Sequence, residues 1–421
     1  MRRRALLPAA LAAVLCGLVS CARKDSPLVI WTDRSEFASY VELFNKTHSD
    51  VKAVVVYKQN PAESLAEPRS SWQGAPPDIV AGHLLKSDRT ARQFVRLDSL
   101  FSAKRIRRES FYQNILAYGK ERSAQLLVPV SFNLPAIIFS ETVSASLPQA
   151  GAVSLEELRG ISAARNQKDS NGSFTAMGFA PSWSSDFLYA AARLFHADFT
   201  RKDATFAWNQ EGIDAFSQFM REWTATNNAS TAAEQEFSFK YLYTPAIKYI
   251  LSGHGTFAFI SSSELFQHTS EQLQGIDFRW LSHGDEIPVA DDIVSMGIYR
   301  KSGKKKPARE FLQWFFTAET QHSLLDRRDE LNLGSMGHSI AGGFSSIKSV
   351  SDNILQRYYG NLAGDMPADE QLAVPGVLPL RWQSLKARVV LPYLQDISST
   401  ERYASARTLE QRLEDWKKQF M

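Results

Sequence analysis

The chain has 421 residues with 48 basic and 45 acidic side chains, so its formal net charge is +3. This length, with 44% hydrophobic and 11% aromatic residues, is enough for two domains that each bury a core. Residues 1–20 contain three arginines and no acid, so without them the basic count falls from 48 to 45 and equals the acidic count. A neutral chain lacks the basic face that nucleic acid requires, and we expect no nucleic-acid partner.

Residues 1–21 have the pattern of a secretory signal. Arg2–Arg4 precede an apolar run over residues 5–19, and Leu18-Val19-Ser20-Cys21 is the cleavage pattern of bacterial lipoproteins. The run is shorter than the roughly 20 apolar residues of a membrane span. We expect cleavage before Cys21 and attachment of acyl chains (diacylglyceryl, palmitate-like) to its thiol, so that the mature chain is held on a membrane in the periplasm or elsewhere outside the cytoplasm. An ordinary signal peptide and an uncleaved anchor are the alternatives.

The next segment predicts a parallel strand–helix–strand unit. Residues 28–32 and 51–57 are short apolar runs typical of buried strands. Between them, Phe37, Tyr40, Val41 and Phe44 recur at helical spacing, with Asp33 and Glu36 placed as a capping-box-like start. Two parallel strands joined by a helix need a right-handed crossover, which indicates an α/β fold.

Strands and helices continue to alternate along the rest of the chain. A third strand is predicted at 77–81, and the apolar segment 126–139 is interrupted by Pro129 and Pro135, where we expect the chain to bend or to cross between lobes. Further strands are predicted at 256–260 and 293–299, with helices beginning at 209 and covering 241–251, 308–325 and 407–420. The pattern predicts two interleaved α/β lobes.

Several of these strings, in this order, resemble a known family. They are LVIWT, PPDIVA, FVRLDSLF, QLLVPVSFNLPAIIFS, SLEELRG, FAPSW, GTFAFISSS and IVSMGIYRKSGKKKPAREFLQWFFTAETQ. Together with the lipoprotein-like leader, the chain resembles family 1 of the extracellular solute-binding proteins of ABC importers, which includes the maltodextrin-binding proteins. The resemblance spans nearly all of residues 27–421.

The resemblance implies a two-lobe periplasmic-binding-protein fold of type II. Each lobe would be a mixed sheet flanked by helices, and a ligand would lie in the cleft between the lobes. Lobe 1 would consist of 27–132 and 289–328, and lobe 2 of 137–275 and 330–421. The hinge crossovers would lie near 129–140, 276–290 and 328–334.

Ligand-binding residues follow from the resemblance and from the chemistry of sugars, which present C–H faces to aromatic rings and hydroxyls to polar side chains. The residues expected in the site are Asp33, Ser35, Glu36, His83, Asn133, Trp183, Ser261, Glu264, Asp292 and Trp382. For Asp33 and Glu36 the alternative is a helix cap, for His83 a surface role, and for the two tryptophans a place in the core. Leu84, Leu85 and Glu264 depart from the maltodextrin group, where polar residues and a tryptophan stand, so the resemblance favours a polar ligand but not maltodextrin itself.

The resemblance therefore predicts a monomeric substrate-binding lipoprotein that captures a sugar or oligosaccharide by hinge closure and delivers it to a membrane permease. No cofactor and no metal are expected, because the eight histidines show no i, i+4 pair. Two alternatives stay open. One is a receptor or adhesin lipoprotein on the same fold, and the other is a secreted glycoside hydrolase that uses neighbouring carboxylates such as Asp291 and Asp292. We expect a binding protein and no enzymatic activity.

Overall fold

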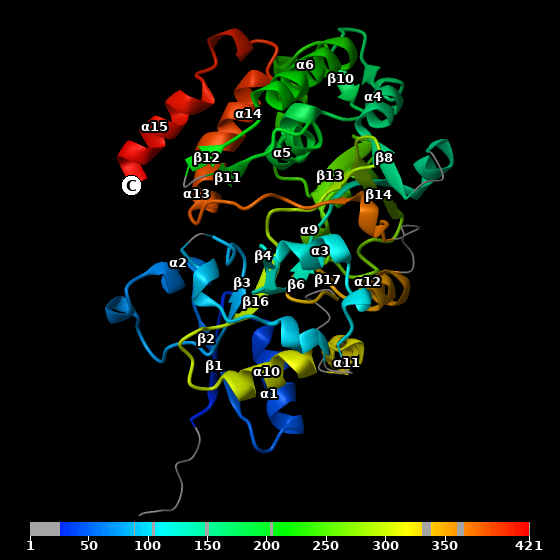
Figure 1. Ribbon diagram of the computed structural model, residues 1–421. Helices are drawn as coiled ribbons and strands as arrows, with labels where there is room; N and C mark the ends of the chain where they lie inside the picture. The colour runs from blue at the N-terminus through cyan, green and yellow to red at the C-terminus, as the bar shows by residue number, and fades with distance from the viewer. Residues whose placement is uncertain are drawn as a thin grey trace, which may run out of the picture.

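The computed structural model describes residues 26–420 except 88, 103–105, 148–150, 203–204, 331–337 and 360–365. The predicted signal peptide and the predicted lipidation site Cys21 lie outside the described residues. Figure 1 shows two lobes, one above the other. In the described part of the chain, no helix has the length and apolar character needed to cross a membrane.

The first lobe is built on a six-stranded mixed sheet. Its strands lie in the order β17-β6-β16-β3-β1-β2. The central strand β1 runs parallel to both β2 and β3, whereas β16 is antiparallel to β3 and β6. The predicted parallel unit is thus confirmed. Its bounds are β1 (Leu28–Thr32), α1 (Phe37–Thr47) and β2 (Ala53–Tyr57), followed by β3 (Ile79–Gly82), β6 (Val128–Phe132), β16 (Val294–Ile298) and β17 (Phe344–Ser345).

Helix α1 joins the first lobe through its aromatic stripe. Phe37 and Phe44 are fully buried, and their rings lie 6.0 Å from Phe315 and 4.9 Å from Phe311 of α10 (Lys305–Phe315). Burying one such side chain contributes roughly 1.5–3 kcal/mol, so this contact holds α1 and α10 together although they are far apart in sequence.

The second lobe contains a four-stranded sheet in the order β13-β7-β14-β8. Its strands are β7 (Pro135–Ser140), β8 (Ala152–Ser154), β13 (Phe257–Ser261) and β14 (Ile276–Ser282). The C-terminal helices pack onto this lobe: in Figure 1, the green α5 and α6 lie beside the red and orange α14 and α15. Their bounds are α5 (Ser185–Leu194), α6 (Gln210–Asn227), α13 (Trp382–Leu385), α14 (Leu391–Ile397) and α15 (Leu409–Phe420).

The remaining helices and strands are short and complete the two lobes. They are α2 (Pro61–Ala66), α3 (Gln113–Tyr118), β4 (Lys120–Glu121), β5 (Ala124–Gln125), α4 (Leu155–Ala163), β9 (Gln167–Lys168), β10 (Phe174–Ala176), β11 (Thr200–Lys202), β12 (Thr205–Ala207), α7 (Thr231–Phe239), α8 (Ala246–Leu251), α9 (Ser262–Leu265), β15 (Ile287–Pro288), α11 (Ala318–Glu330), α12 (Lys348–Asn353) and β18 (Leu372–Ala373).

The chain passes between the two sheets at three places. The first is at residues 133–134, between β6 and β7, within the proline-interrupted segment where the sequence predicts a bend or a crossing. The second follows β14, which lies in the second sheet, so the chain leaves that lobe after residue 282 rather than at 276. The third comes after β17, because β17 pairs with β6 in the first sheet, although the sequence analysis assigns 330–421 to the second lobe. Strands β15 and β18, from the second and third crossings, pair in parallel.

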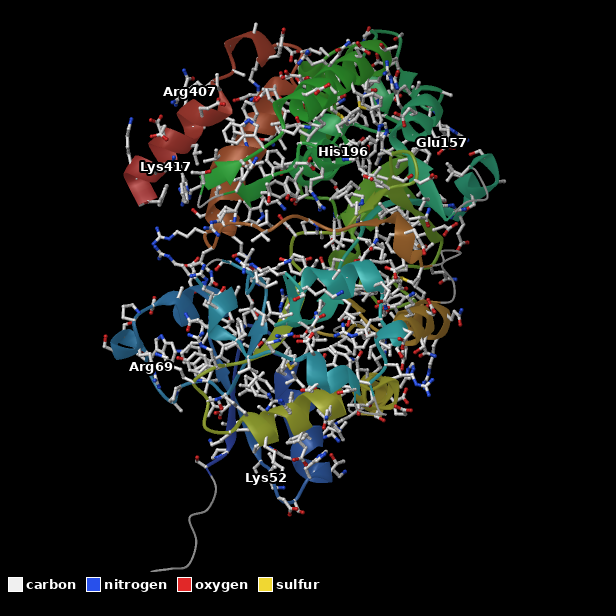
Figure 2. The ribbon with its side chains drawn as sticks, in the orientation of Figure 1. Lys52, Arg69, Glu157, His196, Arg407 and Lys417 are labelled. Atoms are coloured by element: carbon white, nitrogen blue, oxygen red, sulfur yellow. The ribbon has the colours of Figure 1, made fainter. Side chains whose placement is uncertain are left out.

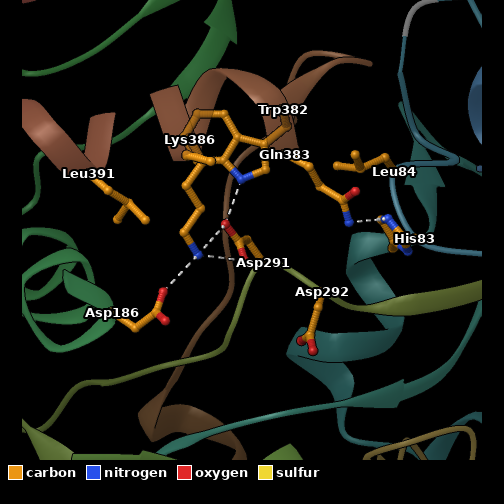
Figure 3. A pocket seen from close by; sticks show the side chains of 10 residues that line it. His83, Leu84, Asp186, Asp291, Asp292, Trp382, Gln383, Lys386 and Leu391 are labelled. Atoms are coloured by element: carbon orange, nitrogen blue, oxygen red, sulfur yellow. Dashed lines mark hydrogen bonds and ion pairs between the residues drawn. The ribbon is translucent and has the colours of Figure 1, made fainter. Parts of the chain in front are cut away.

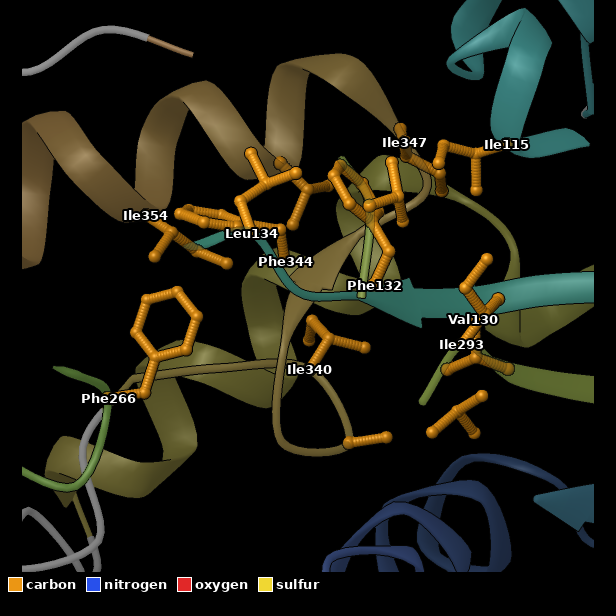
Figure 4. Close-up of a cluster of buried hydrophobic side chains, with 14 of the residues drawn as sticks. Ile115, Val130, Phe132, Leu134, Phe266, Ile293, Ile340, Phe344, Ile347 and Ile354 are labelled. Carbon is orange, nitrogen blue, oxygen red and sulfur yellow. The ribbon is translucent and has the colours of Figure 1, made fainter. Parts of the chain in front are cut away.

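An apolar cluster joins the lobes beside the first crossing (Figure 4). Phe132, Leu134 and Phe344 are buried there together with Phe266, which follows α9 of the second lobe. The Phe266 ring lies 4.7 Å from Phe344 and 5.6 Å from Tyr359. The cluster therefore packs Phe266 of the second lobe against Phe344 of the first sheet.

Two predicted helices are shorter or broken in the structure, and two are confirmed, including the C-terminal helix as α15 (Leu409–Phe420). The segment 241–251 is helical only in α8, because Pro245 at its start cannot continue a helix from the preceding turn. The predicted helix 308–325 is divided into α10 and α11 at Thr317, whose hydroxyl accepts the backbone N–H of Thr320. Asn209 directly precedes α6, as predicted.

Candidate ligand-binding site

Two cavities of about 270 and 370 Å³ lie in the cleft between the lobes. They share Asp186, Asp291, Asp292 and Lys386 in their walls, so the two cavities adjoin. The first cavity is closed on one side by His83 and Leu84 of the first lobe and on the other by α13 (Figure 3). The second cavity continues along α5, α9 and the second crossing.

The centre of the cleft is Asp291, which three groups of the second lobe surround. Its carboxylate accepts the Trp382 indole N–H at 2.5 Å and lies 3.2 Å from the ammonium of Lys386 (Figure 3). Burial opposes its ionisation, but Lys386, the indole N–H and Arg193 together outweigh burial and hold the pKa of Asp291 below its ordinary value. Asp291 therefore carries a charge at neutral pH.

The neighbouring carboxyl, Asp292, behaves in the opposite way. Burial and the nearby charge of Asp291 raise its pKa, in spite of a hydrogen bond from the Asn133 amide at 2.9 Å. Its second oxygen, Oδ1, is buried and has no hydrogen-bond partner among the described residues. An unpaired buried acceptor is unfavourable, so a ligand that donates a hydrogen bond to Oδ1 would remove this penalty.

Asn133, expected as a ligand contact, is occupied by the protein itself. Its amide N–H groups donate to Asp292 and to the Gly342 carbonyl, and its oxygen accepts the Ser262 hydroxyl at 2.8 Å. It lies outside both cavity walls at the first crossing, where it orients Asp292. In this structure Asn133 is a positioning residue.

His83 contacts Asp33 within the first lobe and Gln383 across the cleft. Asp33 Oδ2 lies 3.1 Å from His83 Nδ1, and His83 Nε2 lies 2.6 Å from the Gln383 amide nitrogen on α13. An amide nitrogen only donates, so Nε2 accepts the hydrogen bond from Gln383. Asp33 is therefore not a helix cap: α1 begins after Glu36 without any side-chain cap.

Ser35 and Glu36 do not line the cavities. Ser35 is exposed, and its hydroxyl lies 3.5 Å from the Glu36 carboxylate. The two residues lead into α1 on the first lobe.

Ser261 and Glu264, two of the predicted ligand contacts, lie in the wall of the second cavity. Ser261 ends β13, and its hydroxyl accepts the backbone N–H of Ser263 at the start of α9. Burial and the charge of Asp186 raise the pKa of Glu264, against the effect of His268. With Asp186, Asp291 and Asp292, this wall holds four carboxyl groups and two cations, Arg193 and Lys386.

Arg193 is already engaged by the two crossing segments. Its guanidinium donates to the carbonyls of Val289 and Ala373, the latter at 3.1 Å. The carboxyl groups that line the cleft therefore outnumber the cationic groups that remain to pair with them, and this excess of hydrogen-bond acceptors favours a ligand rich in hydrogen-bond donors.

Trp183 lines a third cavity of about 310 Å³ that shares Ser184 and Phe259 with the second. Its half-buried ring meets Tyr249 edge-on at 4.8 Å. The preceding backbone N–H, of Ser182, donates to the fully buried carboxyl of Glu234 at 3.0 Å. Trp183 is thus held as part of an aromatic wall that continues the cleft.

Trp382 is buried, whereas its predicted role of stacking on a ligand requires an exposed ring face. It is 1% exposed, and Tyr189, Phe199 and Phe206 surround its ring. In this conformation it presents no open face to a ligand and acts on the cleft through its N–H to Asp291.

Sequence reasoning missed Gln383 and Lys386 and named Asp291 only as a carboxylate of the hydrolase alternative. One signal was available: Trp382 and Lys386 are separated by four positions, so both reach Asp291 from one face of the α13 segment. Within the part of the chain that the structure describes, no group of three or more histidine, cysteine or acidic residues is placed to hold a metal ion.

Two α/β lobes joined by three crossing segments around a polar cleft define a two-lobe binding protein. The model of the family described as bacterial extracellular solute-binding protein matches residues 31–322, more than half of the chain. The chain belongs to this family. Its members bind solutes, and the chain is not an enzyme.

Solved structures of similar fold cover nearly the whole chain. CpMnBP1 with mannotriose bound has a TM-score of 0.59 at 14% identity, covering 92% of this chain and 98% of its own. An ABC substrate-binding protein from Listeria monocytogenes in complex with cycloalternan has a TM-score of 0.58 at 12% identity, covering 93% and 97%. A cyclic alpha-maltosyl-1,6-maltose binding protein from Arthrobacter globiformis has a TM-score of 0.57 at 16% identity, covering 92% and 97%. At these identities the likeness establishes the fold, and no curated protein matches the chain.

Proposed function

We propose that the protein is the substrate-binding lipoprotein of an ABC importer and that its solute is a carbohydrate. The main support is the unpaired Oδ1 of Asp292 inside the interlobe cleft, which a sugar hydroxyl would satisfy. The excess of carboxylates and the adjoining Trp183 wall supply further acceptors and an aromatic surface. The sugars named with the similar structures support the same class of ligand.

Ligand capture would proceed by hinge closure about the three crossing segments. A ligand that contacts both walls favours the closed form only as far as it binds that form more tightly. A shift from 1:99 to 99:1 needs a difference of about 5.5 kcal/mol, which a few hydrogen bonds to charged groups at about 1.5–3 kcal/mol each would supply. The closed form would then be recognised by a membrane permease, with the chain acting as a monomer tethered through acylated Cys21.

The test is a calorimetric screen of the mature domain against oligosaccharides, with amino acids and polyamines as comparison sets. We expect a sugar to bind, and Asp292→Ala to weaken that binding about tenfold to hundredfold, the loss of one charged hydrogen bond. Asp285→Ala removes an exposed carboxylate from the same crossing segment and serves as the control. Binding of a polyamine instead of a sugar would redirect the proposal to a cationic solute, which the carboxylate-rich wall also favours.

A further inference from the structure

A separate pocket of about 540 Å³ lies outside the ligand cleft. Its walls come from α15, the β11–β12 hairpin, the segment leading into α13, and Arg89 of the first lobe. It shares no lining residue with the cleft cavities. The α13 segment separates the two sites, because Trp382 and Gln383 face the cleft whereas Arg381 and Leu385 face this pocket.

Four cationic side chains line the pocket: Arg89, Arg201, Arg381 and Lys417. No carboxylate is among the described residues of its wall. Figure 2 shows Lys417 on the C-terminal helix, where it pairs at 2.8 Å with Glu414 of its own helix. Like charges around a concave surface create a positive potential that attracts an anion.

Apart from Thr205, the rest of the wall is apolar. Phe206, Leu413 and Trp416 contribute rings and methyl groups, and the Trp416 N–H is already bonded to the Ser384 hydroxyl at 3.1 Å. The volume lies in the range of small-molecule sites, about 300–1,000 Å³. A small inorganic ion would leave most of this space unfilled, so the wall fits an anion that carries an apolar body.

We propose that this pocket binds an amphipathic organic anion, a carboxylate or phosphate on an apolar chain. Because Arg89 belongs to the first lobe and the other three cations to the second, the bound anion contacts both lobes. The bound anion therefore favours closure of the two lobes, although it binds at a site distinct from the carbohydrate cleft.

The experiment is titration calorimetry of the mature domain with octyl phosphate, octanoate, 1-octanol and inorganic phosphate. We expect the two amphipathic anions to bind, and 1-octanol and inorganic phosphate to bind at least about tenfold more weakly, the effect of one lost interaction of about 1.4 kcal/mol. A preference between octyl phosphate and octanoate identifies the headgroup. Binding of 1-octanol equal to that of octyl phosphate would show an apolar groove only, and equal binding of inorganic phosphate would remove any role for the apolar wall. Either result overturns the proposal.

Substitutions of the cationic side chains test whether the anion binds in this pocket. Arg89→Gln removes an exposed guanidinium and should leave the fold intact, and Arg89→Gln with Arg381→Gln removes one cation from each lobe. We expect about tenfold weaker octyl phosphate binding for each guanidinium removed. Lys418→Gln, a neighbouring exposed lysine of α15, is the matched control and should bind normally. Unchanged binding in both arginine variants would place the anion elsewhere. Sugar binding in the cleft is measured in parallel, so failure here is distinguishable from failure of the proposed function.

Discussion

The ion pair between Lys386 and Asp291 allows a direct test of how much the charged groups of the cleft contribute to the free energy of unfolding. Lys386→Met keeps the apolar stem of the side chain and removes the ammonium, which lies 3.2 Å from the carboxylate. The two side chains are only 19% and 12% exposed, so solvent screens the pair weakly.

The expected loss of stability is large for a single substitution. At 3.2 Å and an effective dielectric constant of about 20, the attraction is about 5 kcal/mol. Removing one partner of a buried pair costs roughly 3–5 kcal/mol, because the remaining charge is left in a poorly solvated place. Since the Trp382 N–H still donates to Asp291, we expect the lower value, about 3 kcal/mol at pH 7.

The loss should depend on pH in a defined direction. The folded-state pKa of Asp291 is lowered, so its contribution to stability is present above the unfolded-state pKa of about 4 and is lost as the pH falls through the folded-state value. The difference between wild type and Lys386→Met should therefore shrink below about pH 4.

The assay is urea unfolding of the wild type, Lys386→Met, Asp291→Asn and the double variant, analysed as a double-mutant cycle. Lys301→Met, at an exposed lysine, is the control and should change the free energy of unfolding by less than about 0.5 kcal/mol. A coupling energy between positions 291 and 386 below about 0.5 kcal/mol would refute the reasoning.

Three further predictions concern other parts of the chain. Asp292→Asn should raise the melting temperature at pH 7, because burial raises the pKa of Asp292 and disfavours its charged form. Asn133 can still donate a hydrogen bond to the oxygen of the new amide. The gain in melting temperature should vanish below about pH 4, where the Asp292 carboxyl is neutral in both the folded and the unfolded protein. No gain at pH 7 would contradict this. Glu234→Gln should lower the free energy of unfolding by about 1–3 kcal/mol, because the new amide N–H would face a donor, either the Ser182 backbone N–H or the Asn228 side-chain N–H. A urea unfolding curve at neutral pH that matches the wild type would contradict this prediction. Cys21→Ser should move the protein from the membrane to the soluble fraction on cell fractionation, and retention on the membrane would exclude the acyl anchor.

Local sequence pattern predicted much of the framework. The helix α1 follows from the spacing of Phe37 and Phe44, and the division of 126–139 follows from two prolines that a continuous central strand does not tolerate. The sequence analysis assigns residues 330–421 to the second lobe, but residues 344–345 lie in the first sheet. They do so because β6, which is distant in sequence, supplies their backbone hydrogen-bond partners.

The site was less accessible to sequence reasoning. His83, Asp292, Ser261 and Glu264 do line the cleft, but sequence alone could not separate Asn133, which orients a neighbour, from a residue that meets a ligand. Both kinds of residue are polar, and both occur in the segments that join strands: Asn133 follows β6 and Asp292 precedes β16.

The order of apolar runs, prolines and helical stripes along this chain was sufficient to determine two α/β lobes, because these features act through neighbours in the sequence. Only the tertiary structure decided which carboxyl has a lowered pKa, which has a raised pKa, and which oxygen is left unpaired. Asp291 and Asp292 are adjacent and chemically identical, yet Lys386 and Trp382 lower the pKa of the first while burial and the charge of Asp291 raise the pKa of the second. Electrostatic energy depends on distance and solvent exposure, and these are set by residues that the fold brings together from across the chain.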